Sequence, residues 1–347
     1  MAAASMVVVD VGDRVNQPVE LAENSRMEKN AMLQRTSIIS QIERKSFVGF
    51  AAPVLFALSL VCPLAATFAQ QPGQRTFATT EAAAGALFAA KQTQNEQDLL
   101  SILGPEGKDV ISSGDPTEDM NSQQNFVDKY QEMHRFATES NGSVSLVIGA
   151  ENWPFPIPLV AKQGSWYFDT ATGKQEILFR RIGRNEAAAM DACSKLVNAQ
   201  ESYFARPQGD LSKQFAYRLV SDEGRHNGLY WHGTENEFAS PIDPLIANAS
   251  GSDQGGDATP YNGYFFRILA SQGPHAPGGA KNYIVDGKMI AGFAFVAYPV
   301  EYRSSGVMTF LVSESGTIYQ KDLGPNTAKL AATMTAYDPD STWKKAE

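Results

Sequence analysis

Hydrophobic positions follow three patterns along this chain, and each pattern predicts a different kind of element. An uncharged apolar run covers residues 47–69. Beyond it, apolar side chains recur every three or four residues in some segments, which is the spacing of amphipathic helices. In other segments they alternate with polar side chains, as half-buried strands do. The chain after residue 69 is therefore predicted to have an α+β fold.

The run at 47–69 predicts a secretory signal peptide. Arg44 and Lys45 precede it, and it ends in a small-x-small pattern at Ala69, before Gln70. A membrane anchor is the alternative, but Pro53 and Pro63 argue against one unbroken helix. The mature protein is expected to be exported, to the periplasm or the medium, with no stable membrane span after cleavage. Residues 1–46 are expected to have no fold, either as a disordered leader or as sequence upstream of the true start.

The first predicted module covers residues 70–183. Helical spacing predicts helices in its first half, including an alanine-rich one that begins at Thr79 or Thr80 and extends through Lys91. Alternation then predicts strands at 144–148, 165–168 and 176–179, with a turn at Thr172-Gly173. Prolines at every second position of 154–158 predict an edge or an extended crossing. Helices on a curved, cone-like antiparallel sheet are the expected result.

The second predicted module covers residues 184–347. A helix is expected from Asn185 to Phe204, followed by a long loop at 233–263 that is rich in Gly, Ser, Asn, Asp and Pro. The remaining segments predict a long helix packed on an antiparallel sheet, similar in order to the head of type IV pilin-like proteins. The strands are expected at 264–269, 291–298, 307–313 and 317–321, with turn residues at 313–316 and a short helix at 327–335.

Charge and cysteine content narrow the functional classes. The net charge is −9, and residues 1–69 carry six basic and six acidic side chains, so the mature chain keeps that charge. An acidic chain without a basic run argues against nucleic-acid binding. After cleavage the one remaining cysteine, Cys193, lies on the apolar stripe of a predicted helix. It is therefore expected to pack in the core, and no intramolecular disulfide is available.

The strongest polar motif is a group of arginines followed by an amide and a carboxylate, predicted at a strand-to-helix junction. Guanidinium groups bind carboxylates and phosphates in a bidentate manner, and an anion can sit at a helix N-terminus. The alternative is an internal salt-bridge network that joins the two modules. The residues are Arg180, Arg181, Arg184, Asn185 and Glu186.

Large aromatic residues offer a second candidate site. Trp153, Trp166, Tyr230 and Trp231, with Phe155, would line an apolar ligand pocket if they converged. Aromatic residues of this size are also common core residues, so packing is the alternative.

Metal and cofactor motifs are weak, and neither a metal nor a cofactor is predicted. His226 and His232 lack further ligands nearby, and the acidic pairs Asp253/Asp257 and Asp338/Asp340 lack calcium-loop spacing. The chain has no Gly-x-Ser-x-Gly elbow and no phosphate-binding loop of the Gly-x-x-x-x-Gly-Lys-Ser/Thr type.

Six strings stand out, at 152–159 (NWPFPIPL), 180–186 (RRIGRNE), 228–231 (GLYW), 260–265 (PYNGYF), 276–280 (APGGA) and 322–327 (DLGPNT). Together they resemble the bacterial exported family called domain of unknown function 2950. The match covers nearly all of the mature chain, and it implies export and fold but no reaction. Arg303 stands where the family pattern leads us to expect a glycine. A weaker similarity links residues 77–168 to the cone-shaped nuclear-transport-factor-like fold.

These observations favour a non-enzymatic binding or assembly factor at the bacterial cell envelope, with an envelope protein or a small ligand as its partner. The alternative is a cofactor-free enzyme with a pocket in the first module, in which Asp169, His134 or Glu176 is the base. An enclosed pocket with a tuned base would favour the enzyme, and an exposed apolar patch would favour the binding role.

Overall fold

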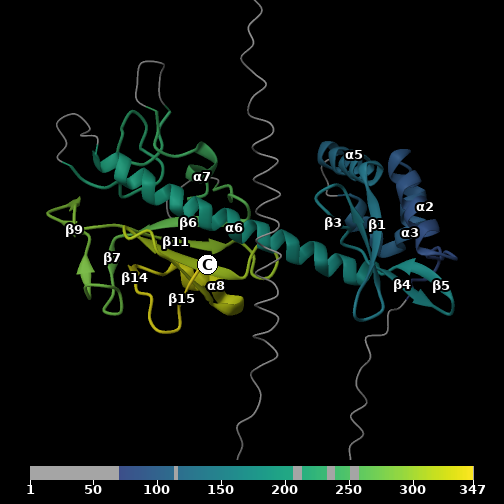
Figure 1. The fold of residues 1–347 in the computed structure, drawn as a ribbon. Helices are drawn as coiled ribbons and strands as arrows, with labels where there is room; N and C mark the ends of the chain where they lie inside the picture. The colour runs from purple at the N-terminus through teal and green to yellow at the C-terminus, as the bar shows by residue number, and fades with distance from the viewer. Residues whose placement is uncertain (1–69, 113–115, 206–212, 233–238, 251–257, 347) are drawn as a thin grey trace, which may run out of the picture. The chain divides into compact units, whose positions relative to one another are not determined.

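The computed structural model describes residues 70–112, 116–205, 213–232, 239–250 and 258–346 (Figure 1). They form two compact units, and the division falls between Phe179 and Arg180. The boundary predicted between residues 183 and 184 lies about one helical turn further on. Residues 1–46 and the predicted signal segment at 47–69 lie outside the described residues. No helix within the described ranges combines the length and the apolar character needed to cross a bilayer.

Unit 1 begins with helices and continues with short strands. Thr79 caps the first of these helices by accepting a hydrogen bond from the N–H of Ala82, and Asn95 caps the second in the same way through the N–H of Asp98. The helices are α2 (Thr80–Gln92), α3 (Glu96–Leu103), the 3₁₀ turn η1 (Pro105–Gly107), α4 (Lys108–Ile111) and α5 (Pro116–Glu132). The strands are β1 (His134–Thr138), β2 (Val144–Ile148), β3 (Trp153–Pro154), β4 (Leu159–Lys162) and β5 (Ser165–Phe168).

The strands of unit 1 form one antiparallel sheet in the order β1-β2-β4-β5. The proline-rich β3 pairs only with β2, as expected for a segment whose prolines cannot donate ladder hydrogen bonds. Leu87 of α2 and Leu99 of α3 belong to the same buried cluster as Leu146 and Phe168 of the sheet. The helices therefore supply one side of the core of this unit and the sheet supplies the other.

Helix α6 (Thr170–Ala205) begins much earlier than predicted. The prediction of a strand at 176–179 and of a turn at Thr172-Gly173 is wrong, because both segments belong to this helix. Asp169 provides the start signal: its carboxylate accepts hydrogen bonds from the N–H and the hydroxyl of Thr172. Gly173 is helical, and a Cβ there would lie 2.5 Å from Cγ1 of Ile157. Gly173 therefore lets α6 pack closely against Ile157, and it does not mark a turn.

Unit 2 contains the rest of α6, short helices and the remaining strands. Its main antiparallel sheet has the order β15-β13-β12-β11-β6, and a second sheet has the order β14-β7-β8. The helices are α7 (Pro244–Asn248) and α8 (Thr327–Ala332), with the 3₁₀ turn η3 (Gly324–Asn326). The strands are β6 (Tyr264–Leu269), β7 (Ser271–Gln272), β8 (Lys281–Asn282), β9 (Ile284–Val285), β10 (Lys288–Met289), β11 (Ala294–Pro299), β12 (Met308–Ser313), β13 (Ile318–Asp322), β14 (Ala336–Tyr337) and β15 (Lys344–Lys345).

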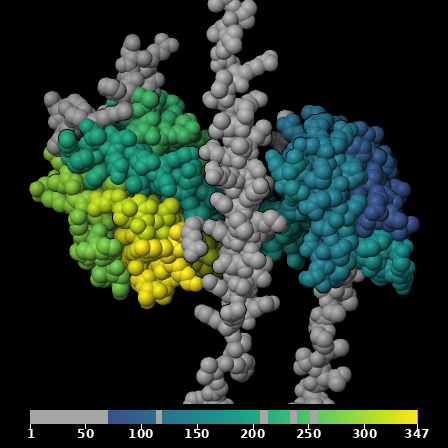
Figure 2. Space-filling model, viewed as in Figure 1, coloured from purple at the N-terminus to yellow at the C-terminus, as the bar shows by residue number. Residues whose placement is uncertain are grey.

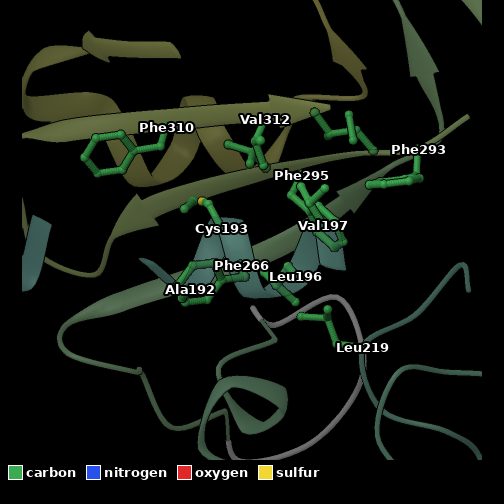
Figure 3. Close-up of a cluster of buried hydrophobic side chains, with 14 of the residues drawn as sticks. Ala192, Cys193, Leu196, Val197, Leu219, Phe266, Phe293, Phe295, Phe310 and Val312 are labelled. Atoms are coloured by element: carbon green, nitrogen blue, oxygen red, sulfur yellow. The ribbon is translucent and has the colours of Figure 1, made fainter. Parts of the chain in front are cut away.

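The core of unit 2 lies between α6 and the main sheet. Cys193 and Leu196 of α6 face Phe295 of β11 and Phe310 of β12 (Figure 3), and all four are at most 1% exposed. Burial raises the pKa of the Cys193 thiol to about 12, so the thiol stays protonated at neutral pH. The prediction that Cys193 packs in the core is confirmed.

The α+β class is confirmed, with helices before an antiparallel sheet and then a long helix with a second antiparallel sheet. The turn at Ser313–Gly316 joins β12 to β13 as predicted. Within the expected loop at 233–263 the structure has the short helix α7, while residues 233–238 and 251–257, with Asp253 and Asp257, lie outside the described residues.

Candidate functional site

The predicted polar motif lies within α6 rather than at its beginning. Because the helix starts at Thr170, Arg180 and its neighbours are not at a helix N-terminus, and the proposed reason for an anion to bind there is lost. Arg181 and Arg184 are exposed and Arg180 is half-buried. Asn185 and Glu186, in contrast, are half-buried and turn toward their own unit.

Asn185 and Glu186 attach α6 to the segment that leads into β12. The side-chain amide of Asn185 donates to the carbonyl oxygen of Ser305 at 2.8 Å. Oε1 of Glu186 accepts the backbone N–H groups of Val307 and Met308, at 2.9 and 3.0 Å. We call this set of contacts the α6 clamp. It satisfies backbone donors that would otherwise be buried without partners.

The α6 clamp places a carboxyl group in a poorly hydrated position. Burial raises the pKa of Glu186, and the charge of Asp322 adds to this, while the N–H groups of Met308 and Val307 act in the opposite direction. Tyr264 lies close by, and its hydroxyl donates to the carbonyl oxygen of Met308 at 2.9 Å. The Asn185 amide, Oε1 of Glu186 and the Tyr264 hydroxyl each bond a backbone group of unit 2, so these contacts hold α6 to the segment that leads into β12.

The loop of the clamp also explains the position where the sequence departs from the family pattern. Arg303 has φ of +61°, a left-handed conformation that glycine adopts most easily. Its backbone N–H donates to the carbonyl oxygen of Gly306, which closes the turn. A Cβ on Gly306 would lie 2.2 Å from the hydroxyl oxygen of Tyr264, so this second position requires glycine.

The predicted aromatic residues belong to two different units. In unit 1, Trp153 and Trp166 are half-buried and pack against the core cluster; Trp166 also exchanges backbone hydrogen bonds with Phe77. In unit 2, Trp231 is buried, and Tyr230 is half-buried with its hydroxyl 3.2 Å from Nδ1 of His232. The structure therefore describes two separate aromatic groups.

The three proposed bases occupy different settings within unit 1. Asp169 caps α6 and has both carboxylate oxygens engaged by Thr172. Nδ1 of His134 lies 3.0 Å from the carbonyl oxygen of Tyr130, and its ring stacks on the Tyr130 ring at 4.0 Å between centroids. Nδ1 therefore carries the proton of the neutral imidazole, and Nε2 is left as an acceptor. Glu176 is half-buried on α6.

The described part of the chain contains no group of three or more His, Cys, Asp or Glu side chains arranged to hold a metal ion. His226 instead packs against Trp231, with 4.6 Å between the ring centroids. Asp338 accepts hydrogen bonds from the backbone N–H of His275 and lies 2.9 Å from Nδ1 of the same residue. This charge pair raises the pKa of His275. Sequence reasoning missed the pair because the partners are far apart in the chain.

Comparison with known families decides the classification. The model of the family described as "Protein of unknown function (DUF2950)" matches residues 74–346. The chain belongs to this family. The suspected resemblance is thereby confirmed, and the DUF2950 match spans both units. No curated protein and no solved structure matches this DUF2950 protein.

The most prominent exposed apolar feature of this DUF2950 protein is a hairpin that sequence reasoning did not identify. Of nine exposed large hydrophobic side chains in the described ranges, Ile284, Val285 and Ile290 fall within seven consecutive residues. β9 and β10 pair in this segment, and β9 lies at the periphery of unit 2 (Figure 1). The light-green part of the chain also reaches the outer margin of that unit in the space-filling view (Figure 2). We call Ile284, Val285 and Ile290 the hairpin surface.

The turn and the base of this hairpin are both well defined. Asp286 and Gly287 have φ of +50° and +77°, the signs required by the two-residue turn that fits a twisted hairpin. Tyr283 and Met289 are 2% and 1% exposed and anchor the hairpin in the core. The N–H of Phe215 donates to the carbonyl oxygen of Met289. A sequence signal was available, since Asp-Gly lies between Ile-Val and Lys-Met, but the exposure of the aliphatic side chains depends on the fold.

Proposed function

We propose that this protein is exported and acts as a non-enzymatic binding or assembly factor at a bacterial cell envelope, and that it binds its partner through the hairpin surface. The observation that carries the proposal is the concentration of exposed aliphatic side chains on one short hairpin. Isolated exposed hydrophobic residues are ordinary, but several on one short hairpin are typical of an interaction surface. The pairing of β9 with β10 puts Val285 on the same face as Ile290, and Ile284 on the opposite face.

The buried attachment of the hairpin to unit 2 supports this role. Because Tyr283 and Met289 are buried, the hairpin is held at its root while its turn and aliphatic side chains face solvent. The hydroxyl of Tyr283 donates to Oε1 of Gln272, which adds a polar attachment. A surface that is ordered before binding loses less conformational entropy when a partner arrives.

Charge suggests the chemistry of the partner. Lys281 and Lys288 are exposed on the hairpin and its approach, in a chain whose net charge is −9. A protein partner with an apolar groove and an acidic rim would complement this arrangement. The hairpin alone is small compared with the roughly 1,200–2,000 Å² that a stable interface buries, so the contact is expected to be transient or to be extended by other surfaces.

The export part of the proposal rests on the sequence. The uncharged run at 47–69, its basic flank and the small-x-small ending are the features that signal peptidases recognise. Mass spectrometry of the protein expressed with its own leader tests this: we expect a mature chain that starts at Gln70. An uncleaved chain in the cytoplasmic fraction would contradict the export proposal and leave the hairpin proposal to be tested separately.

The alternative function, a cofactor-free enzyme with a pocket in unit 1, has less support from the proposed bases. Asp169 is engaged in capping α6. His134 keeps an available acceptor at Nε2, but it is exposed on β1, where water competes for the same nitrogen. General base catalysis is favoured by a shielded group, and His134 is not shielded. The exposed aliphatic side chains of the hairpin therefore support the binding role better than His134 supports an enzyme.

Site-specific photo-crosslinking tests the binding role. A photoreactive phenylalanine analogue replaces Val285 in one variant and Leu330 in a control, since Leu330 is 47% exposed but lies on α8. In intact cells we expect a discrete adduct with another protein from position 285 and none from position 330. Equal patterns from both positions, or no adduct from position 285, would contradict a binding role for the hairpin.

A further inference from the structure

The antiparallel sheet of unit 1 ends in a strand whose outer side is open. β1 pairs with β2, and no other strand of the described residues pairs with it. It is five residues long, contains no proline and pairs with β2 without a bulge. We infer that β1 pairs antiparallel with β1 of a second copy of this chain, so that two sheets join edge to edge. This inference is independent of export and of the hairpin surface.

Two backbone hydrogen bonds fix which groups of β1 face outward. The N–H of Gly149 donates to the carbonyl oxygen of Met133, and the N–H of Glu139 donates to the carbonyl oxygen of Ser143. Hydrogen-bonded and non-hydrogen-bonded pairs alternate along an antiparallel ladder, so the odd-numbered residues of β1 are the ones bonded to β2. The even-numbered residues direct their N–H and C=O groups to the open side, where no described residue bonds them. They are His134, Phe136 and Thr138.

The other sheet edges in the described part of the chain are covered or very short. At the opposite edge of the same sheet, Trp166 of β5 exchanges backbone hydrogen bonds with Phe77. In unit 2, the N–H of Phe266 on β6 donates to the carbonyl oxygen of Ala249. The strands β3, β8, β9, β10, β14 and β15 have two residues each. Covering and shortening protect edges against strand pairing, and β1 has neither protection.

The sequence of β1 fits pairing with itself. When Phe136 lies opposite Phe136 of the second copy, His134 lies opposite Thr138 in both directions. All the outward-facing backbone groups of both strands then exchange hydrogen bonds. A shift of two residues one way leaves His134 opposite Ser140, which lies in the turn after β1. The register centred on Phe136 therefore uses the open edge most completely.

Charge supports the same register. Arg135 and Glu139 are both exposed and point to the same face of the strand. In the centred register, Arg135 lies diagonally across from Glu139 of the second copy, about 7–8 Å away, which long side chains can bridge. A shift of two residues the other way would place Arg135 opposite Arg135 of the second copy, and like charges in that position are destabilising.

Disulfide trapping tests both the contact and its register, in protein purified after expression with its own leader. Cysteine replaces His134 in one variant and Thr138 in another. Across the proposed interface these positions are about 5.5 Å apart between Cα atoms, which a disulfide can span, whereas two identical positions are about 14 Å apart. With oxidised glutathione, the mixed variants should form a covalent dimer at least about tenfold faster than either variant alone. Native Cys193 is buried and should not react.

Two results of the trapping experiment would overturn the inference. One is the absence of a covalent dimer from the mixture, or its formation no faster than in the single variants. The other concerns the cell: an adduct of His134→Cys with a different protein, in place of a second copy, would show that the open edge takes a foreign strand.

Thr138→Pro provides a second measurement that does not depend on cysteine. Because the N–H of Thr138 faces outward, proline should leave the pairing of β1 with β2 intact while it removes a donor and obstructs the open edge. A short strand edge is small compared with the roughly 1,200 Å² of a stable interface, so a reversible dimer is expected. Sedimentation equilibrium should show this dimer in the wild type and a dissociation constant raised about tenfold or more by Thr138→Pro.

Control variants separate this dimer from other effects. Thr138→Val keeps the backbone donor and should leave the dimer unchanged, as should Ile284→Ser combined with Val285→Ser, which alters only the hairpin surface. Circular dichroism should show that all variants keep the wild-type secondary structure. A wild type that stays monomeric at every concentration, or a dimer that Thr138→Pro does not weaken, would overturn the inference.

Discussion

The α6 clamp and the hairpin surface differ in both sequence and structure: the clamp is built from polar side chains bonded within unit 2, and the hairpin surface from aliphatic side chains that face solvent. The clamp arises from the most chemically suggestive motif in the chain, yet Asn185 and Glu186 are occupied by backbone groups of their own unit. The hairpin carries only the Asp-Gly signal of a turn and no polar motif of this kind, yet Ile284 and Val285 remain exposed. The polar groups of Asn185 and Glu186 that the structure describes have their partners within the fold, whereas the aliphatic side chains of the hairpin face solvent.

This difference has a physical basis. A buried carboxylate is stable only where donors surround it, so Glu186 marks a place where the backbone needed acceptors. An exposed aliphatic side chain gains nothing from water, and Val285 and Ile290, which share one face of the hairpin, are a liability unless a partner covers them. The predictions below separate the structural contact from the proposed binding surface.

The largest effect is expected from breaking the clamp. Glu186→Ala leaves the N–H groups of Val307 and Met308 without their acceptor and should lower the free energy of unfolding by about 3 kcal/mol. Glu186→Gln keeps a carbonyl oxygen in place and should cost much less. Urea denaturation of both variants measures the difference. Equal losses would show that charge, rather than acceptance of the two N–H groups, is what matters.

Gly173 comes next. Gly173→Ala places a Cβ 2.5 Å from Cγ1 of Ile157 and should destabilise unit 1 by about 2 kcal/mol through overpacking. Gly85→Ala on α2 is the matched control, because no heavy atom lies within 4 Å of its new Cβ, and alanine is the better helix former by about 0.5–1 kcal/mol. Thermal unfolding should therefore shift in opposite directions. A stabilising Gly173→Ala would refute the close-packing explanation.

A smaller effect concerns pH. Because burial raises the pKa of Glu186 in the folded state, its protonated form is favoured there. The stability gained from this proton is full below the unfolded pKa, near 4.5, and is lost as pH rises through the raised pKa. Glu186→Gln cannot titrate, so the free energy of unfolding of the wild type relative to this variant should fall from pH 4 to pH 8. A difference that stays constant would contradict the raised pKa.

The smallest effect on stability is expected at the hairpin surface. Ile284→Ser combined with Val285→Ser changes exposed side chains, so the free energy of unfolding should change by less than about 0.5 kcal/mol. Binding of a dye that fluoresces in apolar environments should decrease. A large loss of stability would mean that these side chains belong to the core and would weaken the binding proposal.

Local patterns predicted much of the fold. The strand-like segments at 307–313 and 317–321 and the turn residues at 313–316 were sufficient to identify the hairpin of β12 and β13. The start of α6 was missed because Gly173 resembles a turn residue, and only its contact with Ile157 shows why glycine is needed within a helix. Close packing between segments is not visible in local periodicity.

The candidate sites were harder to predict than the fold. Glu186 and its partner Met308 are more than a hundred residues apart, so the sequence could not show that the motif is used internally. The aliphatic residues of the hairpin are visible in the sequence, but their exposure is a property of the folded unit.

The most direct test of the account compares crosslinking from position 285 in two backgrounds. Glu186→Gln removes the carboxyl group of the clamp but keeps a carbonyl acceptor, and Ile290→Ser alters the hairpin surface next to the probe. We predict that the adduct from position 285 persists with Glu186→Gln and is lost with Ile290→Ser, while both proteins remain folded. An adduct that disappears with Glu186→Gln and persists with Ile290→Ser would place binding at the polar motif and contradict the account.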